Sequence, residues 1–151
     1  MEIERKFLVR EMPKLTAYPV KKLEQGYLST GPVVRVRRED NEYYLTYKGG
    51  GLVAREEYNL PLSREAYEHL REKCDGNLIT KKRYLIPLGE LTAELDVFEG
   101  AMEGLIMAEV EFSTLEEAYA FTPPDWMGKD VTEDVRYHNS YMINYTYKEL
   151  F

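Results

Sequence analysis

Hydrophobic and polar residues alternate with a period of two along most of this chain. Because successive side chains of a β-strand point to opposite faces of the sheet, this period predicts strands. Turn-forming residues, such as the three glycines at 49–51, separate the segments. Short strands that turns connect at regular spacing are typical of an antiparallel sandwich or barrel. The predicted strands cover residues 2–10, 20–29, 33–38, 43–48, 52–60, 77–88, 91–98 and 105–113.

Three segments carry helical signals instead. Ser63 is a good N-cap residue before a run with apolar residues at helical spacing. Thr114, followed three residues later by Glu117, has the pattern of a capping box. The tail of the chain is polar and aromatic, with several tyrosines roughly on one stripe. The helical segments are predicted over residues 63–73, 114–120 and 133–150, and the two prolines within 122–126 predict a loop before the last one.

The polar faces of the predicted strands carry pairs of charges of one sign. For a single strand, the simplest interpretation of such a pair is a solvated outer face. The repetition on nearly every strand changes this interpretation, because surfaces that serve solubility mix positive and negative charges. Pairs that are sorted by sign favour two ligands of opposite charge. The acidic pairs are Glu2/Glu4, Glu94/Asp96 and Glu109/Glu111, and the basic pairs are Arg35/Arg37 and Lys81/Arg83.

If these faces line the inside of a closed sheet, they form a hydrated bore that needs counter-ions. Like charges about 5 Å apart repel by about 3 kcal/mol at an effective dielectric constant of about 20. Carboxylates are the preferred ligands of Mg²⁺ and Mn²⁺, and lysine and arginine bind phosphate. A complex of metal and polyphosphate would therefore satisfy both sets. The apolar faces would point outward and would need cover from the helices or from a second subunit, so that a homodimer is one arrangement to expect.

Composition narrows the partners and the compartment. The length of 151 residues fits one domain spanning 1–151. The net charge of −7 argues against nucleic acid as a partner, since that binding depends on cationic contacts to phosphate. No apolar run reaches the roughly 20 residues of a membrane span, and the charged N-terminal segment does not resemble a signal peptide. The single cysteine, Cys74, excludes an internal disulfide, and we therefore expect a cytoplasmic protein.

The N-terminal segment Glu2-Ile3-Glu4-Arg5-Lys6 resembles the E-x-E-x-K signature of the CYTH superfamily, also called triphosphate tunnel metalloenzymes. The resemblance continues in family order along almost the whole chain, at residues 25–28, 34–37, 45–49, 55–57, 80–84, 94–98, 108–112 and 131–137. It implies a mainly β (α+β) fold, namely an eight-stranded antiparallel β-barrel, or tunnel, with a few flanking helices and a C-terminal helix.

The resemblance also implies a role for each matching residue. Leu8 and Asn59 depart from the pattern, since many relatives have another base and another acid there. The residues that would hold Mg²⁺ or Mn²⁺ are Glu2, Glu4, Glu109 and Glu111. The residues that would contact phosphates are Lys6, Arg35, Arg37, Lys48, Lys81, Arg83 and Arg136, the last of which is open to a second interpretation as a cap of the tail helix. The catalytic set would be Lys6, Glu57, Glu94 and Asp96, the three acids acting as partners of the site or as ligands of a second metal ion.

The activity that the resemblance implies is metal-dependent hydrolysis of the terminal phosphoanhydride of a small-molecule triphosphate. The short chain, without an obvious nucleobase pocket, favours inorganic tripolyphosphate, cleaved to diphosphate and phosphate, with nucleoside triphosphates as further substrates. Adenylate cyclase and thiamine triphosphatase are alternatives on the same scaffold. A polyphosphate-binding module is the alternative outside enzymes. The acidic pairs count against it, because carboxylates add nothing to the binding of an anion alone.

Overall fold

One antiparallel sheet organises the protein, and the computed structural model describes residues 1–151. The strand order is β10-β1-β9-β8-β7-β2-β3-β4-β6, and β5 pairs with β1 outside this path. Neighbours in this order pair antiparallel throughout. The strands are β1 (Glu2–Val9), β2 (Val20–Thr30), β3 (Val33–Glu39), β4 (Glu42–Lys48), β5 (Ala54–Arg55), β6 (Glu57–Pro61), β7 (Asp75–Leu88), β8 (Leu91–Glu99), β9 (Ile106–Glu111) and β10 (Met127–Asp130).

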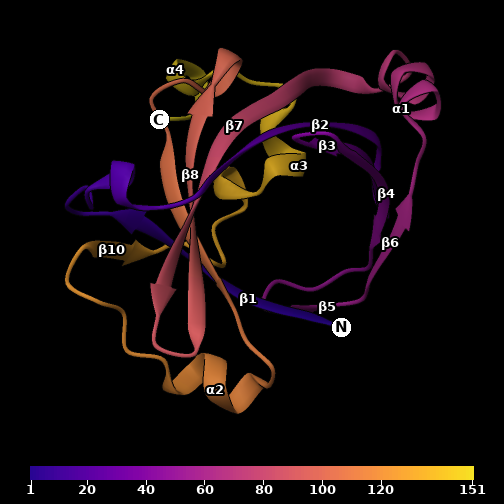
Figure 1. Ribbon diagram of the computed structural model, residues 1–151. Coiled ribbons are helices and arrows are strands. Elements are labelled where there is room, and N and C mark those ends of the chain that lie inside the picture. The colour runs from indigo at the N-terminus through magenta and orange to yellow at the C-terminus, as the bar shows by residue number, and fades with distance from the viewer.

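The sheet curls into a tunnel because β5 and β6 are two halves of one stretch of chain (Figure 1). β6 pairs with β4, whereas β5 pairs with β1, where Arg55 lies opposite Glu2. The far end of the strand order is thereby brought back to β1. The predicted strand over 52–60 is therefore present but broken at Glu56, whose carbonyl accepts a hydrogen bond from the backbone of Gly49 at 2.9 Å. The antiparallel tunnel is confirmed, and β10 is a further short strand that the sequence pattern did not reveal.

Two of the three predicted helices are present. α1 (Arg64–Arg71) and α2 (Leu115–Ala120) begin after Ser63 and Thr114, whose side chains each accept a backbone hydrogen bond at 3.1 Å. Three short 3₁₀ turns accompany them, η1 (Leu15–Ala17), η2 (Gly100–Met102) and η3 (Val135–Tyr137). No helix in the structure combines the length and the apolar character that crossing a membrane requires.

The prediction of a single C-terminal helix is wrong. The tail folds instead into η3, α3 (Asn139–Met142) and α4 (Tyr147–Leu150). Asp134, His138 and Thr146 each adopt extended backbone angles, and each ends a helical run or precedes a new one. The aromatic stripe in the tail therefore does not belong to one continuous helix. This matters for the site, because α3 lies at the tunnel (Figure 1).

The apolar faces of the sheet are covered largely by segments of the same chain. One buried cluster joins Phe7, Leu95 and Val110 of the sheet to Ala118 of α2, with Trp126 packed at its edge. The second cluster joins β-strand residues to the tail, its members being Tyr27, Val33, Ile79, Phe98, Met102, Leu105, Met107, Val131, Tyr137, Met142 and Ile143. The predicted loop over 122–126 thus provides a packing anchor in Trp126. The outer side of β6 stays uncovered, with Tyr58 60% and Leu60 58% exposed.

Candidate active site in the tunnel

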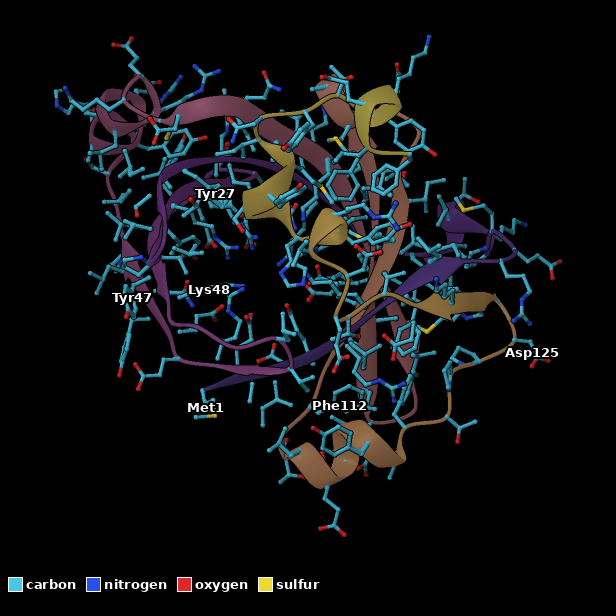
Figure 2. All side chains as sticks on the ribbon, turned by 180° about the vertical axis from the view of Figure 1, so that it is seen from behind. Met1, Tyr27, Tyr47, Lys48, Phe112 and Asp125 are labelled. Atoms are coloured by element: carbon cyan, nitrogen blue, oxygen red, sulfur yellow. The ribbon has the colours of Figure 1, made fainter.

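Strand parity divides the side chains between the bore and the outer surface. Lys48 points into the tunnel, whereas its neighbour Tyr47 points away from it (Figure 2). In β1, Glu4 and Lys6 line the bore, and Arg5 faces outward, where it pairs with Asp130 at 2.8 Å. The bore contains a cavity of about 270 Å³. Only 3 of its 22 lining residues are hydrophobic, so the cavity suits a highly polar ligand.

Most of the predicted site residues meet in this cavity. Asp96 is an exception, because it is fully buried and does not line the cavity; it lies opposite Arg83 on the neighbouring strand and pairs with Lys81 and Arg83. The predicted residues that line the cavity are Glu2, Glu4, Lys6, Arg35, Arg37, Lys48, Glu57, Lys81, Arg83, Glu94, Glu109 and Glu111.

Arg136 is not part of this cavity, so its predicted phosphate contact is not supported. Its side chain is 46% exposed and pairs with Asp134 at 2.7 Å. The guanidinium also lies 5.6 Å from the ring centres of Tyr137 and Phe151. Asp134 accepts hydrogen bonds from both the backbone and the side chain of Arg136, and these bonds hold Arg136 on the outer surface at the start of η3.

Three neighbouring tail residues line the cavity instead, and the sequence analysis missed them. His138 is fixed through Nε2, 3.0 Å from the carbonyl oxygen of Thr132. Asn139 accepts a hydrogen bond from Lys81 Nζ at 3.3 Å, and Ser140 follows it. No period-two pattern marks them, because His138 caps α3 and the two other residues belong to that helix. Parity did contain a signal for two other missed residues, Arg55 and Glu39, which share strand faces with predicted site residues.

Buried carboxylates dominate one part of the cavity. Glu4 lies opposite Glu111 across β1 and β9, and Glu2, Glu4 and Glu109 are each less than a tenth exposed. Burial, and then the charge of Glu4, raises the pKa of Glu2 to about 8. Burial, and then the charge of Glu109, also raises the pKa of Glu4. At Glu109 burial also favours the neutral acid, but the charges of Lys6 and Arg83 together lower its pKa. Carboxylates held this close, two of which resist ionisation, are the expected chemistry of a site for a cation.

Lysines lie among these carboxylates. Lys6 Nζ is 3.9 Å from Glu4 and 3.8 Å from Glu109, and Lys48 Nζ is 2.8 Å from Glu2. In this arrangement no three acidic side chains are close enough together to hold a metal ion. The donor set nevertheless fits a hard divalent cation, because it consists of carboxylate oxygens that compete for positive charge.

A second group of charges centres on Asp96. Its two oxygens accept hydrogen bonds from Arg83 Nε at 2.8 Å and Arg83 Nη2 at 2.9 Å, and Lys81 Nζ lies 2.8 Å away. Burial lowers the pKa of Lys81 to about 8, although the charge of Asp96 opposes this shift. Asp96 therefore fixes the direction in which both cations enter the cavity.

Arg35 differs from most of the other cations of the cavity. Its neighbour Arg37 donates to Gln25 at 2.9 Å and pairs with Glu39 at 3.3 Å. Arg35 is 6% exposed, its Nε has no hydrogen-bond partner, and no carboxylate lies within 4.0 Å of its guanidinium. A buried polar group without a partner is rare in a folded protein and calls for an explanation. An arginine that lines a polar cavity in this state is suited to bind an anion of a ligand.

Fold and site together define a class of protein, namely an antiparallel tunnel whose bore is lined by carboxylates and cations in contact with one another. The family model described as CYTH domain matches residues 1–137. The chain therefore belongs to the CYTH domain family, as the resemblance predicted.

Two relatives and a solved structure show the closeness of this relationship. An inorganic triphosphatase of Nitrosomonas europaea is 43% identical over 145 residues, which cover 91% of this chain and 93% of the relative. An inorganic triphosphatase of Acetivibrio thermocellus is 38% identical over 157 residues, covering 97% of this chain and 96% of the relative. A crystal structure of an inorganic triphosphatase superposes with a TM-score of 0.70 at 37% identity, covering 95% and 94% of the two chains.

Proposed function

We propose that this protein is a divalent-metal-dependent triphosphatase that hydrolyses inorganic tripolyphosphate to diphosphate and phosphate. The observation that carries the proposal is the buried guanidinium of Arg35, which has no partner in the protein and faces a cavity rich in carboxylates. An anion site beside a cation site fits a polyphosphate with its metal. The names of the relatives from Nitrosomonas europaea and Acetivibrio thermocellus support the same substrate.

In this proposal the cluster of buried carboxylates holds the metal. Mg²⁺ or Mn²⁺ bound there would supply a Lewis acid for phosphate oxygens. We assign this role to the set that the sequence predicted, which is Glu2, Glu4, Glu109 and Glu111. The first three are buried together, and Glu111 reaches them across the β1–β9 pair.

The cations of the bore would hold the phosphate chain and stabilise the charge that develops on the leaving diphosphate. Phosphoryl transfer depends on such positioning and charge neutralisation more than on covalent catalysis. Lys6, Arg35, Arg37 and Lys48 line the cavity together with Lys81 and Arg83, which Asp96 orients. We therefore assign Asp96 an orienting role.

The remaining predicted catalytic acids, Glu57 and Glu94, do line the cavity. We propose that they lie beside the water that attacks the terminal phosphoryl group. Lys6 bridges Glu4 and Glu109 within the cluster of carboxylates, and Arg83, 4.0 Å from Glu109, connects this cluster to the charges around Asp96. The free thiol of Cys74 agrees with a reducing cytoplasm as the place of action.

The decisive experiment measures phosphate release from tripolyphosphate with Mg²⁺, with Mn²⁺ and with a chelator. We expect turnover that depends on the metal. Tight binding without turnover would instead identify a polyphosphate-binding module. Formation of cyclic AMP from ATP, or a clear preference for thiamine triphosphate, would move the protein to one of the other activities of this scaffold.

A pair of variants tests the assigned metal ligands. Glu4→Gln removes a buried carboxylate from the bore and should abolish metal-dependent turnover while the protein stays folded. Glu56→Gln is the matched control, because Glu56 is exposed and does not line the cavity. Equal activity of the two variants would remove Glu4 from the metal site.

A further inference from the structure

The cations that line the cavity fall into two groups according to their partners. Five of them have a carboxylate oxygen within 4.0 Å, and these are Lys6, Arg37, Lys48, Lys81 and Arg83. The two others, Arg35 and Arg55, have none. The charges of these two arginines are thus not neutralised by the protein. Arg35 already belongs to the proposed phosphate site, whereas Arg55 has no assigned role.

The position of Arg55 explains why it has no acidic partner. It lies opposite Glu2 on paired strands and is followed two residues later by Glu57. Both of these carboxylates are engaged by Lys48, Glu2 at 2.8 Å and Glu57 at 3.5 Å. Arg55 is therefore surrounded by acids that another cation already occupies.

A backbone contact fixes the side chain of Arg55. Its Nε donates a hydrogen bond of 2.9 Å to the carbonyl oxygen of Gly49, in the glycine-rich turn before β5. The backbone N–H of Gly49 is itself bonded to the carbonyl of Glu56 at 2.9 Å, so the turn is tied to the strand that follows. A carbonyl orients a guanidinium without cancelling its charge. The two terminal nitrogens have no hydrogen-bond partner in the protein, so they are available for a ligand.

We propose that Arg55 is a substrate-binding residue that grips a phosphate group of the polyphosphate through its two terminal nitrogens. This inference rests on the proposed function, since it concerns the substrate of the same cavity. Arginine suits this role because its planar fork binds two phosphate oxygens at once. The pairing with Glu2 places the contact at the carboxylate end of the cavity.

The test compares three variants by calorimetric titration with tripolyphosphate in the presence of a chelator, and by steady-state kinetics with Mg²⁺. Arg55→Gln should weaken metal-free binding and raise KM about tenfold or more, the usual effect of losing a charge-assisted hydrogen bond. Arg55→Lys should fall between Arg55→Gln and the unmodified protein, because it keeps the charge but not the fork. Arg38→Gln is the control, since Arg38 is an exposed arginine that does not line the cavity.

The dependence of binding on salt concentration distinguishes a direct contact between Arg55 and phosphate from a structural role of Arg55. If Arg55 contacts phosphate, the affinity difference between the unmodified protein and Arg55→Gln should shrink as ionic strength rises. Tripolyphosphate binding and KM that match those of Arg38→Gln, in a protein that remains active, would overturn the assignment of Arg55. An unmodified protein that neither binds nor hydrolyses tripolyphosphate would overturn the proposed function itself.

Discussion

Replacing Asp96 by asparagine should lower the stability of the protein, because this carboxylate pairs with buried cations of the bore. Asp96 is fully buried and accepts hydrogen bonds from Arg83 at 2.8 and 2.9 Å, with Lys81 at 2.8 Å. Asparagine keeps the shape but leaves the buried Lys81 without its carboxylate partner and Arg83 with only Glu94 and Glu109. Loss of one partner from a buried ion pair costs about 3–5 kcal/mol. For a domain of this size, roughly 2–4 °C of Tm accompanies each kcal/mol, so Asp96→Asn should lower Tm by about 6–20 °C.

Thermal unfolding followed by circular dichroism measures this effect. Glu68→Gln is the matched control, because its ion pair with Arg64 at 3.1 Å joins side chains that are 59% and 68% exposed. An exposed pair of this kind contributes about 0.5 kcal/mol or less. Tripolyphosphate should raise the Tm of Asp96→Asn more than that of the unmodified protein, since the anion supplies the missing negative charge. Equal losses of Tm in Asp96→Asn and Glu68→Gln would refute the argument that Asp96 stabilises the buried cations of the bore.

Two further predictions concern the tail. Burial, and then the charge of Lys6, lowers the pKa of His138 below 6.5, so the unfolded chain takes up a proton at a higher pH than the folded protein does. The contribution of His138 to stability is thus present above pH 6.5 and is lost as pH falls through the pKa of the folded protein. His138→Gln should therefore make Tm fall less steeply on acidification. Gly76→Ala and Gly89→Ala share a φ near +63°, but only at Gly76 would the new Cβ lie 2.5 Å from the carbonyl oxygen of Ile143. Gly89→Ala should therefore lose about 1–2 kcal/mol, and Gly76→Ala should lose more and release the tail, as limited proteolysis would show.

The sequence predicted the tunnel wall well because strand parity is a property of the backbone. Lys48 and Tyr47 are neighbours in the chain, yet they lie on opposite sides of the sheet (Figure 2). The same rule brought Glu4 and Arg83 into one cavity from distant strands. Similarly, the helix N-caps at Ser63 and Thr114 depend on residues within four positions. Features of this kind are local, so the sequence contains them directly.

The errors lie where partners from elsewhere decide the outcome. Arg136 follows a family motif, yet it lies outside the cavity, where it pairs with Asp134 and its guanidinium lies 5.6 Å from the ring centre of Phe151 at the end of the chain. The sequence also did not reveal that Leu8 packs against the apolar cluster of the tail. Arg55 has the parity of a bore residue, but its availability depends on Lys48 engaging the two nearby acids, which only the tertiary structure reveals.

The balance of charge in the cavity connects the two proposed ligands. Seven acidic and seven basic side chains line it, so their formal charges cancel, while the whole chain carries a formal charge of −7. Five of the seven cations are held by acids of the protein, among them Lys6 and Lys48, which lie within the carboxylate group. A divalent cation on those carboxylates would compete with both lysines and free them for phosphate. Binding of one ligand would thereby favour binding of the other, and by thermodynamic linkage the effect is mutual. Acids and bases in contact within one bore would provide this coupling, whereas a purely basic tunnel would bind the anion without it.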